Sequence, residues 1–472
     1  MDKYKTLAAN TALISIGTFA SKFLLFFMVR FYTAYLSPAD YGTADLITQT
    51  ANLVIPIVSF GITDGVFRFA MDNPALCRNV FSSGILVISA GGCFLLLISL
   101  VLYPMGHLNM ELVLIMLYAL CSCIHSLCAQ FIRGQGRMQM YAFQGILNTA
   151  FLIALNILFL AGMHLGIVGY VVAVAAADLL CTIFLVFKEK LWKYVTWRPD
   201  MGILRSMLRY SIPMIPTTIF WWITSVSDRY MIRAFIDSEA NGMYTIACKI
   251  PTIMTLLAGI FLEAWQFSAV TESQGDTKER DDFFSRIWEL FQAALLLAGS
   301  MLISFAKPEI MILAAKEYFS VWQYVPVLCV ASAFSAFSTF MGSIYLVDKK
   351  SGLYFWTSLF GALVNIGLNL VLIPSPLGVQ GAAIATLCSY IVMFLVRVVS
   401  ARKIIPLQMH GKKLLLGTVL VLLQSAIMVL QTPGWLIVQI LCPLLLFLMY
   451  REVVIATAKR VLKEGRNGLR RR

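Results

Sequence analysis

The sequence predicts an all-α integral membrane protein with about fourteen transmembrane helices. Hydrophobic residues make up 60% of its 472 residues and charged residues only 13%, against about a quarter charged in soluble domains. The mean hydropathy is +0.81. Apolar stretches of about 20 residues, each long enough to cross a bilayer, recur along the whole chain, and basic residues gather in alternate loops between them. A soluble enzyme is therefore excluded.

Hydropathy divides the chain into fourteen spans, with limits good to a few residues. Prolines within them predict kinks rather than helix ends, because neighbouring helices can satisfy the freed carbonyls. These prolines are Pro56, Pro213, Pro216 and Pro251. The expected spans are 8–32, 42–68, 79–103, 110–132, 141–162, 166–187, 210–234, 241–269, 284–306, 322–346, 353–373, 379–400, 413–431 and 434–450.

The distribution of Lys and Arg predicts the orientation. With the N-terminus inside, the loops on the inner side and the tail 451–472 hold nearly all of the 37 basic residues, whereas the outer loops hold Lys307 and Lys316. A shift by one span would destroy this asymmetry, so it supports an even number of spans and two cytoplasmic termini. The net charge of +13 follows from this bias and needs no nucleic-acid partner. The basic tail is expected either on the membrane surface, bound to anionic lipid headgroups, or as a frayed and solvated end.

The two halves of the chain resemble each other. Met28–Phe31 is echoed by Met231–Phe235, and Gly166–Gly169 by Gly378–Ala382, at a nearly constant offset. Spans seven to twelve therefore repeat spans one to six in the same orientation, and transporters commonly place their substrate site between such repeats. The predicted divisions are an N-terminal lobe 1–187, an amphipathic cytoplasmic linker 188–209, a C-terminal lobe 210–400, two added spans in 401–450 and a basic tail 451–472.

Five cations fall inside the apolar spans. Each costs about 2.5–3.5 kcal/mol on the insertion scale if it is unpaired, so something must offset them. A polar cavity for an anionic substrate would do so, since arginine donates paired hydrogen bonds to phosphate. Snorkelling to an interface, or pairing with buried acids, is the structural alternative. The five are Lys22, Arg30, Arg229, Arg233 and Lys249.

Uncharged and acidic residues extend this candidate site. Asp45, Gln49 and Asn52 recur at helical spacing and predict a polar face on span two. Thr245 and Thr252 flank Lys249 in the same way and predict a polar stripe on span eight. We expect these five residues to line the cavity.

Two further acids are candidates for coupling to an ion. Asp178 follows three alanines and is either a proton or cation site or a hydrogen bond that packs two helices, with packing favoured. Asp64 lies four residues before Arg68, which predicts an ion pair.

Signatures of enzymes are missing. The ten cysteines are scattered without a CxxC pair, and the four histidines are isolated, so we interpret them as packing and loop residues. No phosphate-binding GxxxxGK[ST], HExxH or GxSxG motif occurs. We therefore expect no catalytic residue, no metal and no cofactor.

Several motifs resemble the polysaccharide-biosynthesis flippases. They are Leu36–Gly42, Gly61–Phe69, Arg133–Arg137 followed by Tyr141, and Asn369–Ala383. The resemblance covers essentially the whole chain. It implies a multidrug/oligosaccharidyl-lipid/polysaccharide exporter fold in a bacterial cytoplasmic membrane, with two six-helix lobes that open alternately to each side.

The resemblance also implies a cargo and partners. The cargo is an undecaprenyl-pyrophosphate-linked oligosaccharide for O-antigen (lipopolysaccharide) or capsule, whose pyrophosphate meets the five cations named above. The partners are membrane lipids and the polymerase and glycosyltransferases of the same pathway. The alternatives are a peptidoglycan-precursor flippase of the lipid II type, a cation-coupled multidrug exporter, and, less favoured because the outer loops are short, a membrane polysaccharide polymerase.

Overall fold

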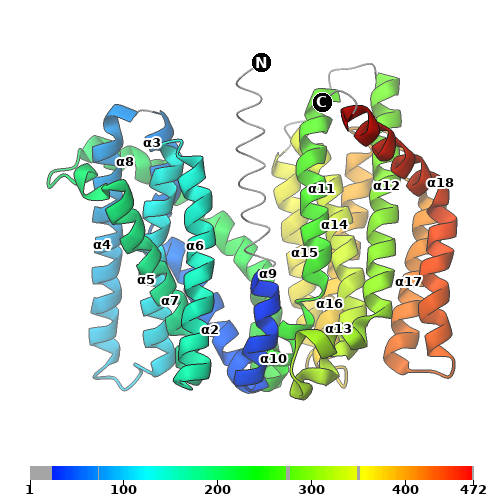
Figure 1. The fold of residues 1–472 in the computed structure, drawn as a ribbon, viewed down its shortest axis with the longest axis horizontal. Coiled ribbons are helices and arrows are strands. Elements are labelled where there is room, and N and C mark those ends of the chain that lie inside the picture. Colours follow the sequence, from blue (N-terminus) through cyan, green and yellow to red (C-terminus); the bar gives the residue numbers. More distant parts are fainter. Residues whose placement is uncertain (1–23, 73, 273–276, 348–350, 470–472) are drawn as a thin grey trace. The chain divides into compact units, whose positions relative to one another are not determined.

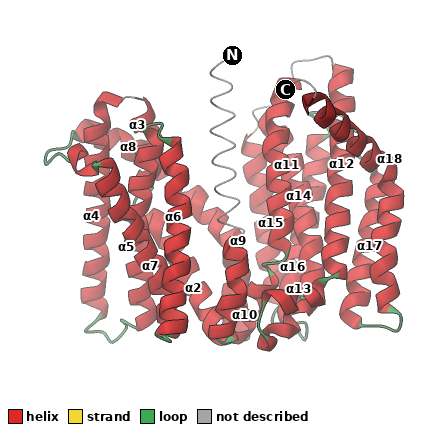
Figure 2. Ribbon diagram, viewed as in Figure 1, coloured by secondary structure: helices red, strands yellow, loops and turns green. Residues whose placement is uncertain are grey.

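The computed structural model describes residues 24–72, 74–272, 277–347 and 351–469. Every regular element in these residues is a helix, which confirms the predicted all-α class (Figure 2). The chain forms two compact units, Met1–Tyr230 and Met231–Arg472. The division falls inside the helix Ile215–Phe235. It does not test the predicted lobe limits, which stay a prediction.

The first unit is built from the helices shown in blue to green in Figure 1. After a short apolar helix, Leu24–Tyr35, its elements are α2 (Pro38–Val58), α3 (Ile62–Asp72), η1 (Pro74–Leu76), α4 (Cys77–Leu102), α5 (Met110–Gly134), α6 (Met138–Asn156), η2 (Ile157–Gly162), α7 (Gly166–Glu189), η3 (Leu191–Tyr194), α8 (Met201–Ser211), η4 (Ile212–Met214) and most of α9 (Ile215–Phe235).

The second unit follows with the same kind of element. Its helices are α10 (Ser238–Ala247), α11 (Pro251–Glu272), α12 (Thr277–Ser304), α13 (Ala306–Leu313), η5 (Lys316–Gln323), α14 (Val325–Val347), α15 (Ser351–Leu372), α16 (Val379–Ala401), α17 (Gly411–Leu430) and α18 (Trp435–Leu469).

The helices account for the predicted spans. Within the described residues, ten helices are long and apolar enough to cross a membrane, or twelve if two bent pairs each count as one span. The first predicted span is described only from residue 24 onward, as the short helix Leu24–Tyr35. The seventh corresponds to α9, which contains Asp228, Arg229 and Arg233.

Both bent spans occupy the second position of their half, which is what a repeat requires. α2 and α3 meet at 54°, and α10 and α11 meet at 44°. Pro56 lies just before the first break and Pro251 begins the helix after the second. Proline removes a backbone donor and crowds the preceding turn, so these spans bend there.

A second repeated device is the glycine turn before the last span of each half. Gly166 and Gly378 have positive φ angles, +55° and +51°, which glycine adopts without steric cost. Three residues later, a Cβ on Gly169 would lie 2.9 Å from Leu165 Cβ, and one on Gly381 only 2.4 Å from the carbonyl oxygen of Leu372. The sequence echo therefore encodes two equivalent close turns.

The predicted linker 188–209 folds onto the first unit. Ser82 of α4 donates a hydrogen bond to the carbonyl oxygen of Tyr194, at 3.1 Å, and accepts one from the backbone N–H of Thr196, at 2.7 Å. α8 packs so closely on α3 that a Cβ on Gly65 would lie 2.7 Å from Ser211 Oγ. At the other end of the chain, α18 continues from the last span into the tail as one helix of 35 residues.

Candidate functional site

The contact between α2 and α9 contains a buried ion pair. Ser37 caps α2 by accepting a hydrogen bond from the backbone N–H of Asp40, and two turns along the helix Asp45 is only 9% exposed. Nη1 of Arg229 donates to both oxygens of Asp45, at 2.8 and 3.0 Å. Charge-assisted bonds of this kind are about twice as strong as neutral ones.

Further contacts fix the same two helices. The indole N–H of Trp222 donates to the carbonyl oxygen of Gln49 at 2.8 Å, and the hydroxyl groups of Tyr230 and Thr50 are hydrogen-bonded. The rings of Trp222 and Tyr230 lie 5.4 Å apart. The part of α9 between Trp222 and Tyr230 is therefore held on α2, and Arg229 follows the structural alternative, pairing with a buried acid.

The other four predicted cations lie on separate parts of the chain. Lys22 lies outside the described residues. Arg30 is exposed on the helix Leu24–Tyr35, Arg233 is half-buried in the last turn of α9, and Lys249 lies in the break between α10 and α11. Arg229 belongs to the first unit and Arg233 to the second. A shared cationic cavity stays a prediction.

The expected polar stripe around Lys249 is wrong in its geometry. The helix breaks between Thr245 and Thr252, so their spacing no longer places them on one face. Thr245 is fully buried, whereas Thr252 is exposed and its hydroxyl donates to the carbonyl oxygen of Cys248 at 2.9 Å. On α2, Asn52 accepts a hydrogen bond from the hydroxyl of Tyr118 at 3.2 Å. Whether these residues line a cavity stays a prediction.

The predicted pair between Asp64 and Arg68 is also wrong. Arg68 Nε lies 3.2 Å from the carboxylate of Asp72, one helical turn further along, and both side chains are about half exposed. An acid lies four residues away on either side of Arg68. In an isolated helix, an acid that precedes the cation is the better arrangement, which favours Asp64. Asp64 instead lies in the first turn of α3, where a carboxylate suits the N-terminal end of the helix dipole.

Asp178 is the centre of a buried polar cluster in the first unit. It is 7% exposed on α7. Its carboxylate accepts hydrogen bonds from Asn148 Nδ2 of α6 at 2.9 Å and from the hydroxyl of Ser122 of α5. Nδ1 of His125 lies 3.2 Å from the same carboxylate. Side chains of α5 and α6 thus contact one acid of α7, which supports the interpretation of Asp178 as a residue that packs helices together.

His125 connects Asp178 to a further residue. Its Nε2 lies 2.8 Å from Oε1 of Gln144, and the thiol of Cys181 donates to the same oxygen at 3.6 Å. His125 is therefore not isolated, although its contacts with α6 and α7 agree with the interpretation as a packing residue. The missed signal was a titratable ring inside an apolar span, one turn from Ser122, where polar groups almost always have partners.

Arg397 is a buried cation that the sequence argument did not single out. It is 2% exposed inside α16 of the second unit. Its guanidinium donates to Thr357 Oγ1 at 3.0 Å, to the carbonyl oxygen of Ser338 at 2.8 Å and to Ser358 Oγ at 2.6 Å, and it lies 4.5 Å from the ring centroid of Tyr354. Its position within the predicted span 379–400, close to the end, was the available signal.

No candidate metal centre occurs in the described part of the chain, where no group of three or more His, Cys, Asp or Glu could hold a metal ion. All ten cysteines are free. In the described clusters, polar side chains join neighbouring helices through hydrogen bonds and charges.

Fold and composition define the class: a helical membrane protein that crosses the bilayer many times and is built like a transporter. The chain belongs to the family described as polysaccharide biosynthesis protein, whose profile matches residues 7–266. It is 23% identical over 404 residues to an uncharacterized membrane protein of Methanocaldococcus jannaschii, covering 80% of this chain and 94% of that protein.

Two solved structures share the fold. One is the lipid II flippase MurJ in an inward closed conformation, with a TM-score of 0.68, 15% identity, and coverage of 95% of this chain and 99% of that one. The other is an inward-facing multidrug resistance transporter of the MATE family and MOP superfamily, with a TM-score of 0.62, 14% identity, and coverage of 81% and 95%. At these identities the likeness is one of fold.

Proposed function

We propose that the protein is a flippase that carries undecaprenyl-pyrophosphate-linked oligosaccharide repeat units across the cytoplasmic membrane of a bacterium by alternating access, for O-antigen, capsule or a related surface polysaccharide. Membership of the polysaccharide biosynthesis family carries this proposal. The transporter fold and the inward bias of Lys and Arg support it, the latter with both termini in the cytoplasm. The pathway's glycosyltransferases would supply the cargo, and its polymerase would take it up.

The cationic role is proposed for fewer residues than the sequence suggested. The guanidinium of Arg229 donates to both carboxylate oxygens of Asp45, so we assign it to holding α9 on α2. We propose Lys22, Arg30, Arg233 and Lys249 as the residues that bind the pyrophosphate. Arginine and lysine together would supply a bidentate donor and point charges for that group.

The test is transport into liposomes of a fluorescent polyprenyl-pyrophosphate oligosaccharide by the purified full-length protein. We expect uptake that Arg233→Ala lowers about tenfold, because one charge-assisted contact is lost. Arg233→Lys keeps the charge and should retain part of the activity. Wild-type uptake that Arg233→Ala leaves unchanged would remove this residue from the cargo site.

A peptidoglycan-precursor flippase is the second candidate, because the solved lipid II flippase has the same fold over 95% of this chain. Both cargoes carry a polyprenyl diphosphate and differ in the sugar and peptide attached. The same liposome assay, run in parallel with a lipid II analogue and with a cationic drug, distinguishes an oligosaccharide flippase from a peptidoglycan-precursor flippase and from a multidrug exporter. Faster uptake of the lipid II analogue would replace the oligosaccharide proposal.

We further propose Asp178, rather than Asp64, as the residue that couples transport to protons. Asp178 is buried and shares a hydrogen bond with a histidine, whereas Asp64 is exposed at the start of α3. A carboxylate and an imidazole in contact can exchange protons as the lobe changes conformation. In proteoliposomes, Asp178→Asn should abolish the response of uptake to an imposed pH gradient. A response as large as that of the wild type would exclude this role.

A further inference from the structure

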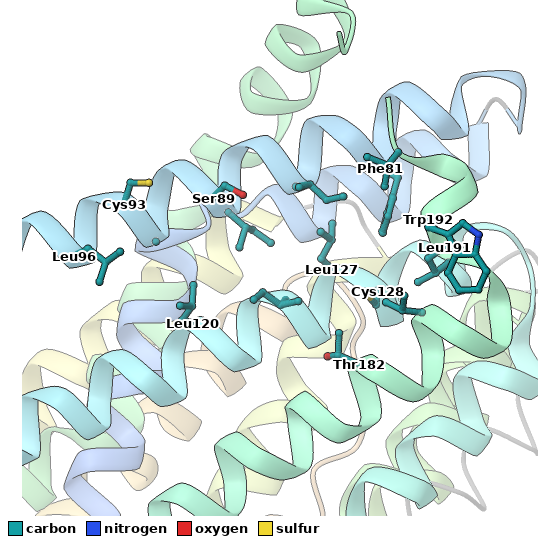
Figure 3. Close-up of a pocket in the computed structure, with 16 residues that line it drawn as sticks. Phe81, Ser89, Cys93, Leu96, Leu120, Leu127, Cys128, Thr182, Leu191 and Trp192 are labelled. Atoms are coloured by element: carbon teal, nitrogen blue, oxygen red, sulfur yellow. The ribbon is translucent and has the colours of Figure 1, made fainter. Parts of the chain in front are cut away.

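A long apolar groove runs along the outside of the first unit. It has a volume of about 530 Å³ and is lined by residues of α4, α5 and α7, together with the η3 segment that follows α7 (Figure 3). The lining on α4 extends from Phe81 to Leu96, which is about 22 Å of helix. Half of a bilayer's hydrocarbon is about 15 Å thick. The groove is therefore long enough for a complete acyl chain.

The groove is open to whatever surrounds these spans. Leu96 is 64% exposed, and Cys93 is exposed on the same helix. The neighbouring glycines Gly91 and Gly92 of α4 face different surroundings. A Cβ on Gly91 would lie 2.2 Å from the carbonyl oxygen of Val58, so that face packs tightly on α2. Gly92 lines the groove, where a Cβ would meet only Leu120, at 3.2 Å.

At one end, the groove is bordered by residues of the η3 segment, which we call the rim. Leu191 is 1% exposed and Trp192 is 47% exposed, and both line it. The bonds from Ser82 to the segment 194–196 hold this rim on α4, and the ring of Tyr194 lies 5.1 Å from that of Phe131. Tryptophan is enriched where hydrocarbon gives way to headgroups, so the rim is at headgroup level.

The rim carries positive charge next to the lining residues. Lys188, Lys190 and Lys193 are exposed and alternate with the residues that line the groove. The acid among them, Glu189, is bound to Arg137. In the described residues none of the three lysines has an ion-pair partner, so their charge is available to a ligand.

From the apolar groove and its basic rim we infer a binding site for an anionic phospholipid, with one acyl chain in the groove and the phosphate at the rim lysines. A basic residue at such a surface contributes about fivefold to the affinity for anionic lipid. Within the first unit, α4 lies on the flank away from α9 (Figure 1). The groove is thus remote from the α2–α9 contact, which favours a resident membrane lipid over the transported cargo.

The test uses photolabelling and does not depend on transport, so it stands or falls separately from the proposed cargo. The full-length protein is reconstituted in phosphatidylcholine vesicles that contain a little phosphatidylglycerol with a diazirine in its acyl chain. After illumination, mass spectrometry of the peptides should find the adduct on the α4 residues between Ser89 and Leu96. An equal yield with a phosphatidylcholine probe would overturn the proposal, because it would mean ordinary contact with bulk lipid.

Two sets of variants test the binding of the acyl chain and of the headgroup separately. Gly92→Leu and, independently, Ser89→Phe fill the groove and should remove most of this labelling, whereas Leu100→Phe, on the same helix outside the groove, should leave it unchanged. Lys190→Gln and Lys193→Gln should each lower the preference for phosphatidylglycerol about fivefold. Labelling that survives both filling variants would contradict the acyl-chain site.

Competition identifies the source of the ligand. Unlabelled phosphatidylglycerol should displace the probe, and an equal amount of polyprenyl phosphate should not. The opposite result would overturn the phospholipid proposal and assign the groove to the tail of the cargo.

Discussion

In each half, polar side chains join the fifth and sixth spans, but only the cluster in the first half contains charged residues. In the first, Asn148 of α6 donates to the carboxylate of Asp178 on α7. In the second, Asn365 of α15 donates to the hydroxyl of Thr386 on α16, at 3.4 Å. Asn369, fully buried, donates to Asn365 at 3.0 Å.

The two clusters therefore join their helices through different kinds of groups. The cluster between α6 and α7 contains a carboxylate and an imidazole, whereas the one between α15 and α16 consists of a hydroxyl and two amides. The following variants test the comparison.

A large effect is expected at the ion pair between α2 and α9. Arg229→Ala leaves Asp45 buried without its partner, which should lower the free energy of unfolding by about 3–5 kcal/mol. The double variant Arg229→Met with Asp45→Leu removes both charges and should recover most of that loss. The measurement is unfolding of the purified protein in mixed micelles. A single variant as stable as wild type would show that the pair contributes nothing.

The next effect concerns the charged cluster itself. Asp178→Leu leaves Ser122, Asn148 and His125 without their shared acceptor, at about 1–3 kcal/mol for each buried polar group that stays unsatisfied. The neutral equivalent, Thr386→Val, removes one long hydrogen bond and should cost only about 0.5–1.5 kcal/mol. If Thr386→Val destabilised the protein as much as Asp178→Leu does, the contrast between the lobes would be false.

The repeated glycine turn offers a comparison within one motif. Gly381→Ala brings a Cβ to 2.4 Å from a backbone oxygen, whereas Gly169→Ala meets its nearest atom, a side-chain Cβ, at 2.9 Å. Overpacking typically costs about 1–3 kcal/mol, and we expect the second-half variant to lie at the upper end of that range. Thermal unfolding in detergent measures both. The reverse order would indicate that α15 and α16 yield more easily than α6 and α7.

A separate effect is a pH dependence in the second unit. Burial raises the pKa of Glu309, on the short helix α13, to about 8. Since its unfolded value is near 4.5, the folded state holds the proton more tightly, and stability should fall as pH rises from about 4.5 to about 8. Glu309→Gln should flatten this part of the profile. An unchanged slope would show that other groups cause it.

The sequence predicted the helical class, two of the kinks and the repeat because these depend on local composition and spacing. The kinks predicted at Pro213 and Pro216 are wrong, since these prolines lie in η4 and in the first turn of α9, where a new helix begins. Pro56 and Pro251 indicated the two bends, and the glycines at 166 and 378 indicated equivalent turns. Partnerships between helices were harder. Asp45 and Arg229 are distant in sequence, so nothing local joined them. Asp64 and Asp72 lay equally close to Arg68, and His125 acquired its role only when three helices met. Spacing also failed at Lys249, because the helix stops there.

The last helix, α18, carries the span and the tail on one backbone. Its 35 residues measure about 52 Å along the axis, well beyond the about 30 Å of a bilayer's apolar layer. Since one turn continues into the next, the segment beyond the span cannot swivel as a loose tether would. A lipid surface or another polypeptide that binds the end of α18 would therefore also restrain the orientation of the terminal transmembrane segment.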